Sequence, residues 1–188
     1  MKILSIDIGI KNFAYCVLES DDTGICKLED WSVVELCDSK TNASKVDLII
    51  VGSVMNEKFN KIFKKYNFDK IVIENQIGRN AIRMKMVQGM VSMYFIINKY
   101  SIDKIINYNA VHKLKNFMKS KTKTTYQERK KLSKEVCKKL VEEEFHYMNK
   151  VFNKSKKKDD LADCLLQGLD YLKKNSNLDD SYFNVMEK

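Results

Sequence analysis

The chain has 188 residues, 44% apolar and 31% charged, and its 34 basic residues against 25 acidic ones give a formal net charge of +9. This composition is typical of one globular domain and excludes a disordered or fibrous chain. The longest apolar stretch, 86–97, is too short to span a bilayer, and the amino-terminal segment lacks the features of a signal peptide. We therefore expect an intracellular protein without a membrane partner.

Three antiparallel strands are predicted at 2–8, 13–18 and 26–36, where short apolar runs are separated by turn-sized gaps. An amphipathic helix is predicted at 45–66, followed by a short buried strand at 70–73 that leads into Glu74. A helix at 80–100 and a strand at 104–108 come next, and further helices are expected around 110–117, 127–147 and 160–173. This order predicts an α/β domain with a mixed five-stranded sheet flanked by helices.

The helix at 80–100 carries apolar residues on more than one face. One contact with the sheet requires only a single apolar stripe, so a second buried surface is implied.

Positive charge is concentrated in one segment, because residues 99–158 contain 18 basic and six acidic residues. Such a surplus attracts a polyanion, and phosphate neutralisation dominates nucleic-acid affinity. Nucleic acid is therefore the leading partner. The alternative is a solvated helical face that keeps the protein soluble. The lysine clusters at 119–123 and 154–158 are expected to lie in loops.

Carboxylates at two strand ends and on one helix are the candidates for chemistry. Asp7 lies among isoleucines in a core strand, where a charge is costly unless it is paired or bound to metal, although it could also cap a turn. Glu74 ends the neighbouring strand, or marks its exit into solvent. Asp160 and Asp163 share a helix face. N-capping and the helix dipole favour an acid in the first turn of a helix, which explains Asp160. They do not explain Asp163, which lies in the second turn.

Four such carboxylates supply hard oxygen ligands, which suit Mg²⁺ or Mn²⁺ rather than zinc. Without a cation they would repel one another. Two ions so held could support hydrolysis of a phosphodiester. The five cysteines form no C-x-x-C pair, and we expect them to be reduced thiols, most of them in the core.

The order of the segments SIDIGIKNFAYCVLE, IVIENQ, NAIRMKMVQGM and KKDDLADCLL resembles the RuvC-like Holliday junction resolvases, especially their poxvirus branch. The resemblance implies a ribonuclease-H-like fold, a nuclease domain at 1–174 with a short tail at 175–188, and a homodimer that nicks four-way DNA junctions symmetrically with Mg²⁺ or Mn²⁺. Because the resemblance is to viral proteins, it also implies that the protein is located in the cytoplasm of the host cell.

The resemblance and the basic segment together imply three groups of site residues. The catalytic metal ligands are Asp7, Glu74, Asp160 and Asp163, with Asp159 as an ambiguous neighbour. The DNA-binding residues are Arg79, Arg83, Lys113, Lys115, Lys119, Lys121, Lys123, Lys130, Lys156 and Lys157. The dimer contacts are Met90, Tyr94 and Phe95 on the helix at 80–100.

Other functions are compatible with parts of this pattern. A ribonuclease H acting on RNA–DNA hybrids would use the same fold and acids. A basic DNA-binding protein without catalysis would use only the charge. The Asp-Ile-Gly turn at Asp7 also occurs in actin-like sugar kinases, but these need two such domains and a later glycine-rich loop, which this chain lacks.

Overall fold

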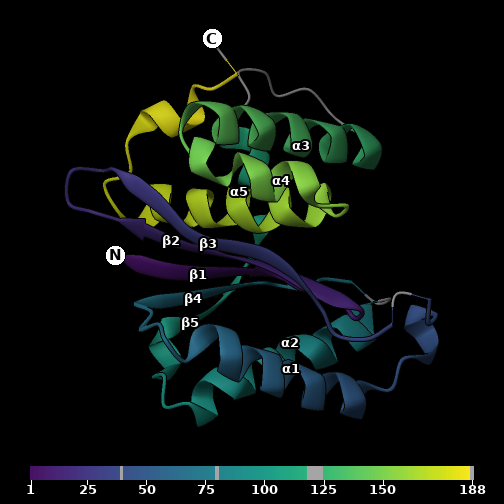
Figure 1. Ribbon diagram of the computed structural model, residues 1–188. Coiled ribbons are helices and arrows are strands. Elements are labelled where there is room, and N and C mark those ends of the chain that lie inside the picture. Colours follow the sequence, from purple (N-terminus) through teal and green to yellow (C-terminus); the bar gives the residue numbers. More distant parts are fainter. Residues whose placement is uncertain (39, 79–80, 118–124, 187–188) are drawn as a thin grey trace.

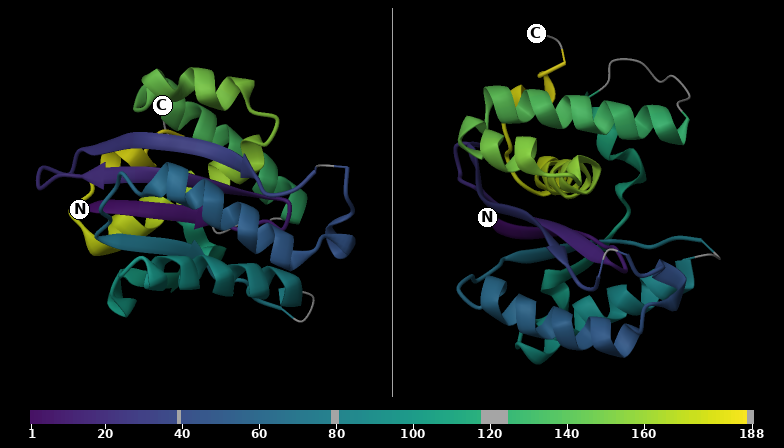
Figure 2. Two further views of the ribbon diagram at one scale, coloured as in Figure 1. Left: turned by 60° about the horizontal axis from the view of Figure 1, so that its bottom comes forward. Right: turned by 45° about the vertical axis from the view of Figure 1, so that its right-hand side comes forward.

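A computed structural model describes residues 1–38, 40–78, 81–117 and 125–186, and shows one sheet between two layers of helices (Figure 1). The strands are β1 (Lys2–Asp7), β2 (Asn12–Ser20), β3 (Cys26–Glu35), β4 (Lys70–Glu74) and β5 (Ile105–Tyr108). The helices are α1 (Leu48–Phe63), α2 (Ile82–Ile97), α3 (Tyr126–Glu143), α4 (Asn149–Lys154) and α5 (Lys158–Asn175), with 3₁₀ helices that include η4 (Ala110–Phe117) and η6 (Asp180–Phe183). Helices α3, α4 and α5 cover one face of the sheet, and α1 and α2 lie against the other (Figure 2).

The sheet order is β3-β2-β1-β4-β5. The pairs β1–β2 and β2–β3 are antiparallel, whereas β1–β4 and β4–β5 are parallel, so the expected mixed sheet is confirmed. Ile6 of β1 is the register partner of Ile73 of β4. The next residue on each strand is an acid, Asp7 and Glu74, and both acids therefore lie at one edge of the sheet.

Alternation along the strands decides which face each acid points to. Leu4 and Ile6 pack in the core under α1 and α2, whereas Ile3 packs in the core under α5. Asp7 has the parity of Ile3, and Glu74 has the parity of Val72, which belongs to the same α5-side core. Both carboxylates are therefore directed toward α5.

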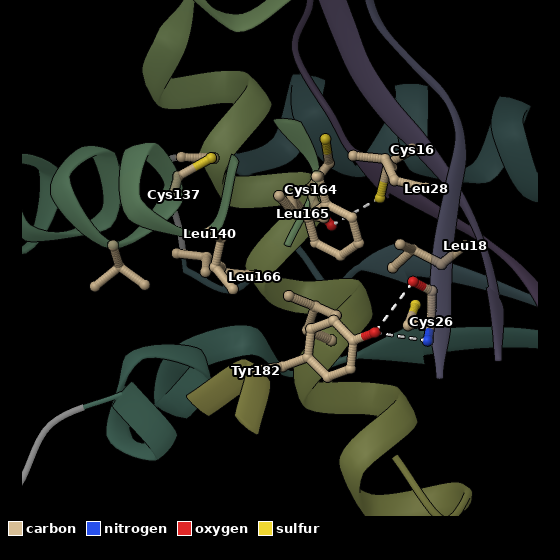
Figure 3. Packing of buried hydrophobic residues seen from close by; sticks show 14 of the residues in the cluster. Cys16, Leu18, Cys26, Leu28, Cys137, Leu140, Cys164, Leu165, Leu166 and Tyr182 are labelled. Carbon is tan, nitrogen blue, oxygen red and sulfur yellow. Dashed lines mark hydrogen bonds between the residues drawn. The ribbon is translucent and has the colours of Figure 1, made fainter. Parts of the chain in front are cut away.

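Helix α5 packs closely on β1 and β2 through a buried leucine-rich face, part of which Figure 3 shows with Cys164 and Leu165. Gly168 permits this approach, because a Cβ there would lie 2.6 Å from Leu18 Cδ1 and 3.1 Å from Ser5 Cβ. A larger residue would push the helix away from the strands that carry the acids.

Several expected boundaries differ from the structure. The predicted helix at 127–147 ends at Glu143, and a separate helix, α4, follows; the segment 110–117 is 3₁₀ rather than α-helical. In the lysine tract at 154–158, residues 155–157 form a loop, as expected, whereas Lys154 ends α4 and Lys158 begins α5. The tract at 119–123 lies outside the described residues. All five cysteines are free thiols, as expected.

The segment expected to be a short tail packs against the main core. Within it η6 forms, and Tyr182, Phe183 and Val185 are buried on the α5 side of the sheet. The Tyr182 hydroxyl donates a hydrogen bond to the Cys26 carbonyl and accepts one from the Cys26 amide (Figure 3). These residues are part of the folded unit.

The predicted dimer contacts on α2 differ in their exposure. Tyr94 and Phe95 are only 7% and 1% exposed, and their rings pack against Phe59 of α1. Met90 is partly buried and lines a groove of 290 Å³ between α1 and α2, together with Met93 and other residues. The apolar side chains of α2 that face solvent are Ile82, Met86, Met93, Ile96 and Ile97. None of the helices in the described part of the chain is both long and apolar enough to cross a bilayer.

Candidate active site

Three acids that are distant in sequence meet at one edge of the sheet. Asp7 ends β1, Glu74 ends the adjacent parallel strand β4, and Asp163 lies in the second turn of α5 above them. The side chain of Lys113, from η4, reaches into this group: its Nζ is 2.7 Å from Asp163 Oδ1 and 3.8 Å from Glu74 Oε1. The result is a compact cluster of three carboxylates and one ammonium, hereafter the acid cluster.

The carboxylates perturb one another strongly. Burial raises the pKa of Asp7 well above its ordinary value, and the neighbouring Glu74 carboxylate raises it further. Burial also raises the pKa of Asp163, although Lys113 opposes this effect. For Lys113, burial acts to lower the pKa, but the charges of the three acids outweigh it and the pKa lies above its ordinary value. One ammonium therefore does not neutralise the negative charge collected here.

Asp160, the fourth predicted ligand, lies one turn before Asp163 and faces a different partner. Its Oδ2 accepts a hydrogen bond of 2.9 Å from Asn12 Nδ2, at the start of β2, and lies 3.7 Å from Lys157 Nζ. Asp159 is turned toward α3, where its Oδ2 pairs with Lys130 Nζ at 2.9 Å. In this structure Asp160 therefore flanks the acid cluster, and Asp159 serves as an ion-pair partner.

The donor set fits a hard divalent cation. All four side chains offer carboxylate oxygens, which Mg²⁺ and Mn²⁺ prefer. Burial and, after it, the charge of Glu74 raise the pKa of Asp7, and a bound cation would oppose this rise. No three acidic, thiol or imidazole groups within the described ranges already converge in a metal-holding geometry. The ammonium of Lys113 lies between two of the acids instead.

A cavity of 500 Å³ opens beside the acid cluster. Its lining includes Glu74, Asp163 and Lys113 of the acid cluster and Arg129 and Lys130 of α3. Acidic and basic side chains thus border the same cavity. The lining also includes the exposed ring of Tyr126, over which Lys130 Nζ lies 5.3 Å from the ring centroid.

A model of the family described as Poxvirus A22 protein matches residues 1–175. The chain belongs to this family. It is 30% identical over 173 residues to the Holliday junction resolvase of fowlpox virus, which covers 92% of each chain. It is also 27% identical over 126 residues to the mitochondrial cruciform cutting endonuclease 1 of Schizosaccharomyces pombe. That match covers 57% of this chain and 46% of the yeast protein. The chain therefore aligns with about half the length of that relative.

Solved structures agree with the family assignment. The fowlpox virus resolvase, in a crystal structure with substrate Holliday junction DNA, superposes with a TM-score of 0.63 at 27% identity and covers 93% of this A22-family chain and 99% of its own. RuvC of Thermus thermophilus, also bound to a Holliday junction, has a TM-score of 0.59 at 12% identity, with coverage of 94% and 98%. The second likeness concerns the fold alone. Together they confirm the RuvC-like, ribonuclease-H-like fold.

The DNA-binding residues predicted for this A22-family protein have different surroundings. Lys113 and Lys130 line the cavity, and Lys157 lies near it through its pair with Asp160. Arg83 instead donates a hydrogen bond to the Val46 carbonyl, on the α1 side of the sheet. Lys115 and Lys156 are exposed. The predicted binders outside the described residues are Arg79, Lys119, Lys121 and Lys123.

Three residues of the site were not among the predicted ones. Asn12 holds Asp160, Arg129 lines the cavity, and Gln76 donates a hydrogen bond of 3.3 Å from Nε2 to Glu74 Oε2. Arg129 belongs to the basic segment, so charge alone could have suggested it. Nothing local distinguishes Asn12 or Gln76 from ordinary turn residues, because their roles depend on which strand ends meet.

Proposed function

We propose that this protein is a Holliday junction resolvase, a divalent-metal-dependent endonuclease that nicks four-way DNA junctions at symmetric positions. The observation that carries the proposal is the convergence of Asp7, Glu74 and Asp163 from three separate elements beside a cavity that Arg129 and Lys130 also line. Membership of the poxvirus A22 family supports it, as do relatives named as junction-cutting enzymes.

In this proposal the carboxylates of Asp7, Glu74, Asp160 and Asp163 hold a pair of Mg²⁺ or Mn²⁺ ions. A divalent cation at this place supplies the Lewis acidity that activates water and stabilises the leaving oxygen of a phosphodiester. The protein's contribution is to collect oxygen ligands on rigid elements: two come from strand ends and two from one helix face. Asn12 orients the Asp160 carboxylate, and Gln76 orients that of Glu74.

Basic side chains around the cavity bind and orient the substrate backbone. Lys113 donates hydrogen bonds from within the acid cluster and presents its charge where a reacting phosphate would lie. Arg129 and Lys130 neutralise neighbouring phosphates from α3, and Lys157 does so from the start of α5. The exposed Lys115 and Lys156 extend this basic surface away from the acids.

The proposal includes a homodimer. Two symmetric nicks require two equivalent active sites, which a twofold dimer provides. The solvent-facing apolar side chains of α2, including Met86, Met93 and Ile97, are the surface that a second copy would cover. We place the protein inside the infected cell, in the host cytoplasm, in keeping with its viral family.

A cleavage assay on defined substrates tests the proposal. The protein is incubated with Mg²⁺ and, in parallel, with a four-way junction, a linear duplex and an RNA–DNA hybrid, and the nicks are mapped. We expect paired nicks at symmetric positions in the junction only. Asp163→Asn should cut at least about 1,000-fold more slowly while still binding the junction, because it loses a ligand but no basic residue.

Asp179→Asn is the matched control, since Asp179 caps η6 far along the chain and accepts from the Ser181 amide. It should cut at the wild-type rate. Preferential cutting of the hybrid would favour a ribonuclease H instead, and junction binding without any cutting would favour a non-catalytic DNA-binding protein.

A further inference from the structure

Gln167 is a buried polar residue beneath the acid cluster. It lies on α5, four residues after Asp163 and therefore on the same helix face, and is only 1% exposed. Its Nε2 lies 3.1 Å from Ser5 Oγ, 3.2 Å from the Ile6 carbonyl and 3.2 Å from the Val72 carbonyl. One side chain thus joins the helix that carries Asp163 to both strands that carry the other acids.

The chemistry of these partners defines the orientation of the amide. The two carbonyl oxygens can only accept hydrogen bonds. The Ser5 hydroxyl donates its proton to the Cys164 carbonyl at 2.8 Å, so toward Gln167 it also acts as an acceptor. Three acceptors therefore surround the NH₂ group of Gln167. Among the uncharged side chains, only glutamine and asparagine carry such a group, and the asparagine side chain is one methylene shorter.

The positions of the partners relate this contact to the site. Ile6 immediately precedes Asp7, and Val72 lies two residues before Glu74 on its strand. The Ser5–Cys164 hydrogen bond and the close approach at Gly168 hold the helix against the same strands. These contacts set how far along the sheet α5 lies, and the place of the Asp163 carboxylate follows from that.

We infer that Gln167 is a positioning residue of the active site, which sets the separation of Asp163 from Asp7 and Glu74 by hydrogen-bonding α5 to β1 and β4. The inference rests on the proposed function for the use of those acids. A residue that only satisfies buried polar groups would affect folding stability but not, selectively, the binding of a cation by the acids.

The test is Gln167→Met, which keeps a similar side-chain length and removes the donors. The affinity of the full-length protein for Mn²⁺ is measured by electron paramagnetic resonance, and junction affinity without metal and junction cleavage are measured alongside. We expect Mn²⁺ affinity and cleavage rate each to fall by about 10- to 100-fold, as is usual when a group that orients metal ligands is lost. Junction affinity should stay within about twofold, because the basic residues that bind phosphates are unchanged.

Tyr182→Phe is the matched control. It removes a buried hydroxyl that bonds Cys26, in the same core but without any contact to the acid cluster (Figure 3). It should keep wild-type Mn²⁺ affinity and cleavage. If Gln167→Met does not fold, Gln167→Asn decides the question, since it keeps the amide on a side chain one methylene shorter, leaves the Ser5–Cys164 hydrogen bond in place and should weaken Mn²⁺ binding severalfold.

Wild-type Mn²⁺ affinity in a folded Gln167→Met or Gln167→Asn protein would overturn the inference, as would an equal loss in Tyr182→Phe. Failure of the proposed function has a different signature. In that case the wild-type protein binds Mn²⁺ but cuts no junction, and the comparison of Mn²⁺ affinities still decides the role of Gln167.

Discussion

Among single side chains, Lys113 has surroundings unlike those of the other predicted DNA-binding lysines. The family resemblance makes Lys113, Lys115 and Lys130 candidates to lie near the reacting phosphate; of these, Lys113 has a side chain that is only 13% exposed and pairs with Asp163. Charge that is buried and paired in this way is arranged for chemistry rather than for long-range attraction of DNA. Its neighbour Lys115 is exposed and keeps the role first expected for both.

Lys113→Met separates these roles. We expect junction cleavage to fall by at least about 100-fold, because a positioned donor at the reacting phosphate is lost. Junction affinity measured without metal should fall by less than about threefold, since the ammonium is held by acids. Lys115→Met is the matched control and should have the opposite profile, with weaker binding and a nearly normal rate at saturation. A large loss of affinity in Lys113→Met would return this residue to the phosphate-binding surface.

Asp7 imposes a stability cost in the absence of metal. Its raised pKa means that the folded state disfavours the ionised form, so stability falls as the pH rises from the unfolded-state value near 3.8 through the folded-state value. Asp7→Asn removes this charge. At pH 8 in EDTA we expect the variant to be more stable than the wild type by about 1 kcal/mol in chemical unfolding.

Added Mn²⁺ should reverse this order. The wild type gains stability by binding the cation, and the variant, which lacks one ligand, gains less. The two unfolding curves should therefore approach or cross as Mn²⁺ increases. An Asp7→Asn protein that is less stable than the wild type in EDTA would show that the carboxylate makes favourable contacts that outweigh the repulsion.

Among the structural elements, α3 supplies the basic wall of the cavity and depends on a well-formed start. Thr125 caps it: its Oγ1 accepts from the Glu128 amide at 3.2 Å, and Glu128 Oε2 accepts from the Thr125 amide at 2.7 Å. This reciprocal capping box orders the first turn, which carries Tyr126, Arg129 and, one residue on, Lys130. The helix start therefore links local sequence to the geometry of DNA binding.

Thr125→Ala should lower the free energy of unfolding by about 1 kcal/mol and weaken junction binding through a frayed first turn.

A pH effect accompanies the capping box. The hydrogen bond from the Thr125 amide lowers the pKa of Glu128, so its contribution is present above the unfolded-state value of 4.5 and is lost as the pH falls through the lowered value. The stability difference between wild type and Glu128→Ala should therefore shrink below about pH 4.5. Thr23→Ala, in the β2–β3 turn, provides a control that leaves α3 untouched.

For the complete protein, the two faces of the sheet have different tasks. The α3–α5 side holds the acid cluster and most of the basic segment, whereas α1 and α2 lie on the opposite side (Figure 2). Both of these helices carry large apolar side chains that are exposed to solvent. Exposed apolar patches of this kind mark association surfaces. A dimer formed there would leave the acid cluster, which lies on the other side of the sheet, uncovered.

Met93→Lys tests this arrangement. Met93 is 52% exposed, so the substitution should leave the unfolding free energy within about 0.5 kcal/mol of the wild type. We expect light scattering at micromolar concentration to change from a dimer to a monomer, and paired nicking to be replaced by uncoupled single nicks. Ile25→Lys is the control, because Ile25 is 62% exposed in the β2–β3 turn and should not alter the dimer. A Met93→Lys protein that remains dimeric would place the interface elsewhere.

The order of strands and helices, and the two strand-end acids, followed from the sequence because both depend on local pattern. Apolar runs and turn residues identify β1 and β4, and alternation along a strand decides the face of each side chain. The position of Asp7 and Glu74 at the ends of two predicted neighbouring strands was sufficient to place both acids at one edge of the sheet, whereas the register in the structure shows that they share a face. The same local logic placed Asp163 on the leucine-rich helix.

Tertiary structure alone decided the rest. Helix α2 is apolar on several faces, so its periodicity could not show that Tyr94 and Phe95 pack on α1 while Met93 meets solvent. Lys113 is 50 residues from Asp163, and Gln167 is 161 residues from Ile6, so their contacts depend on how α5 and η4 settle on the sheet. Sequence determines which chemical groups are present and the side of each element they occupy, whereas only long-range packing brings particular groups within bonding distance.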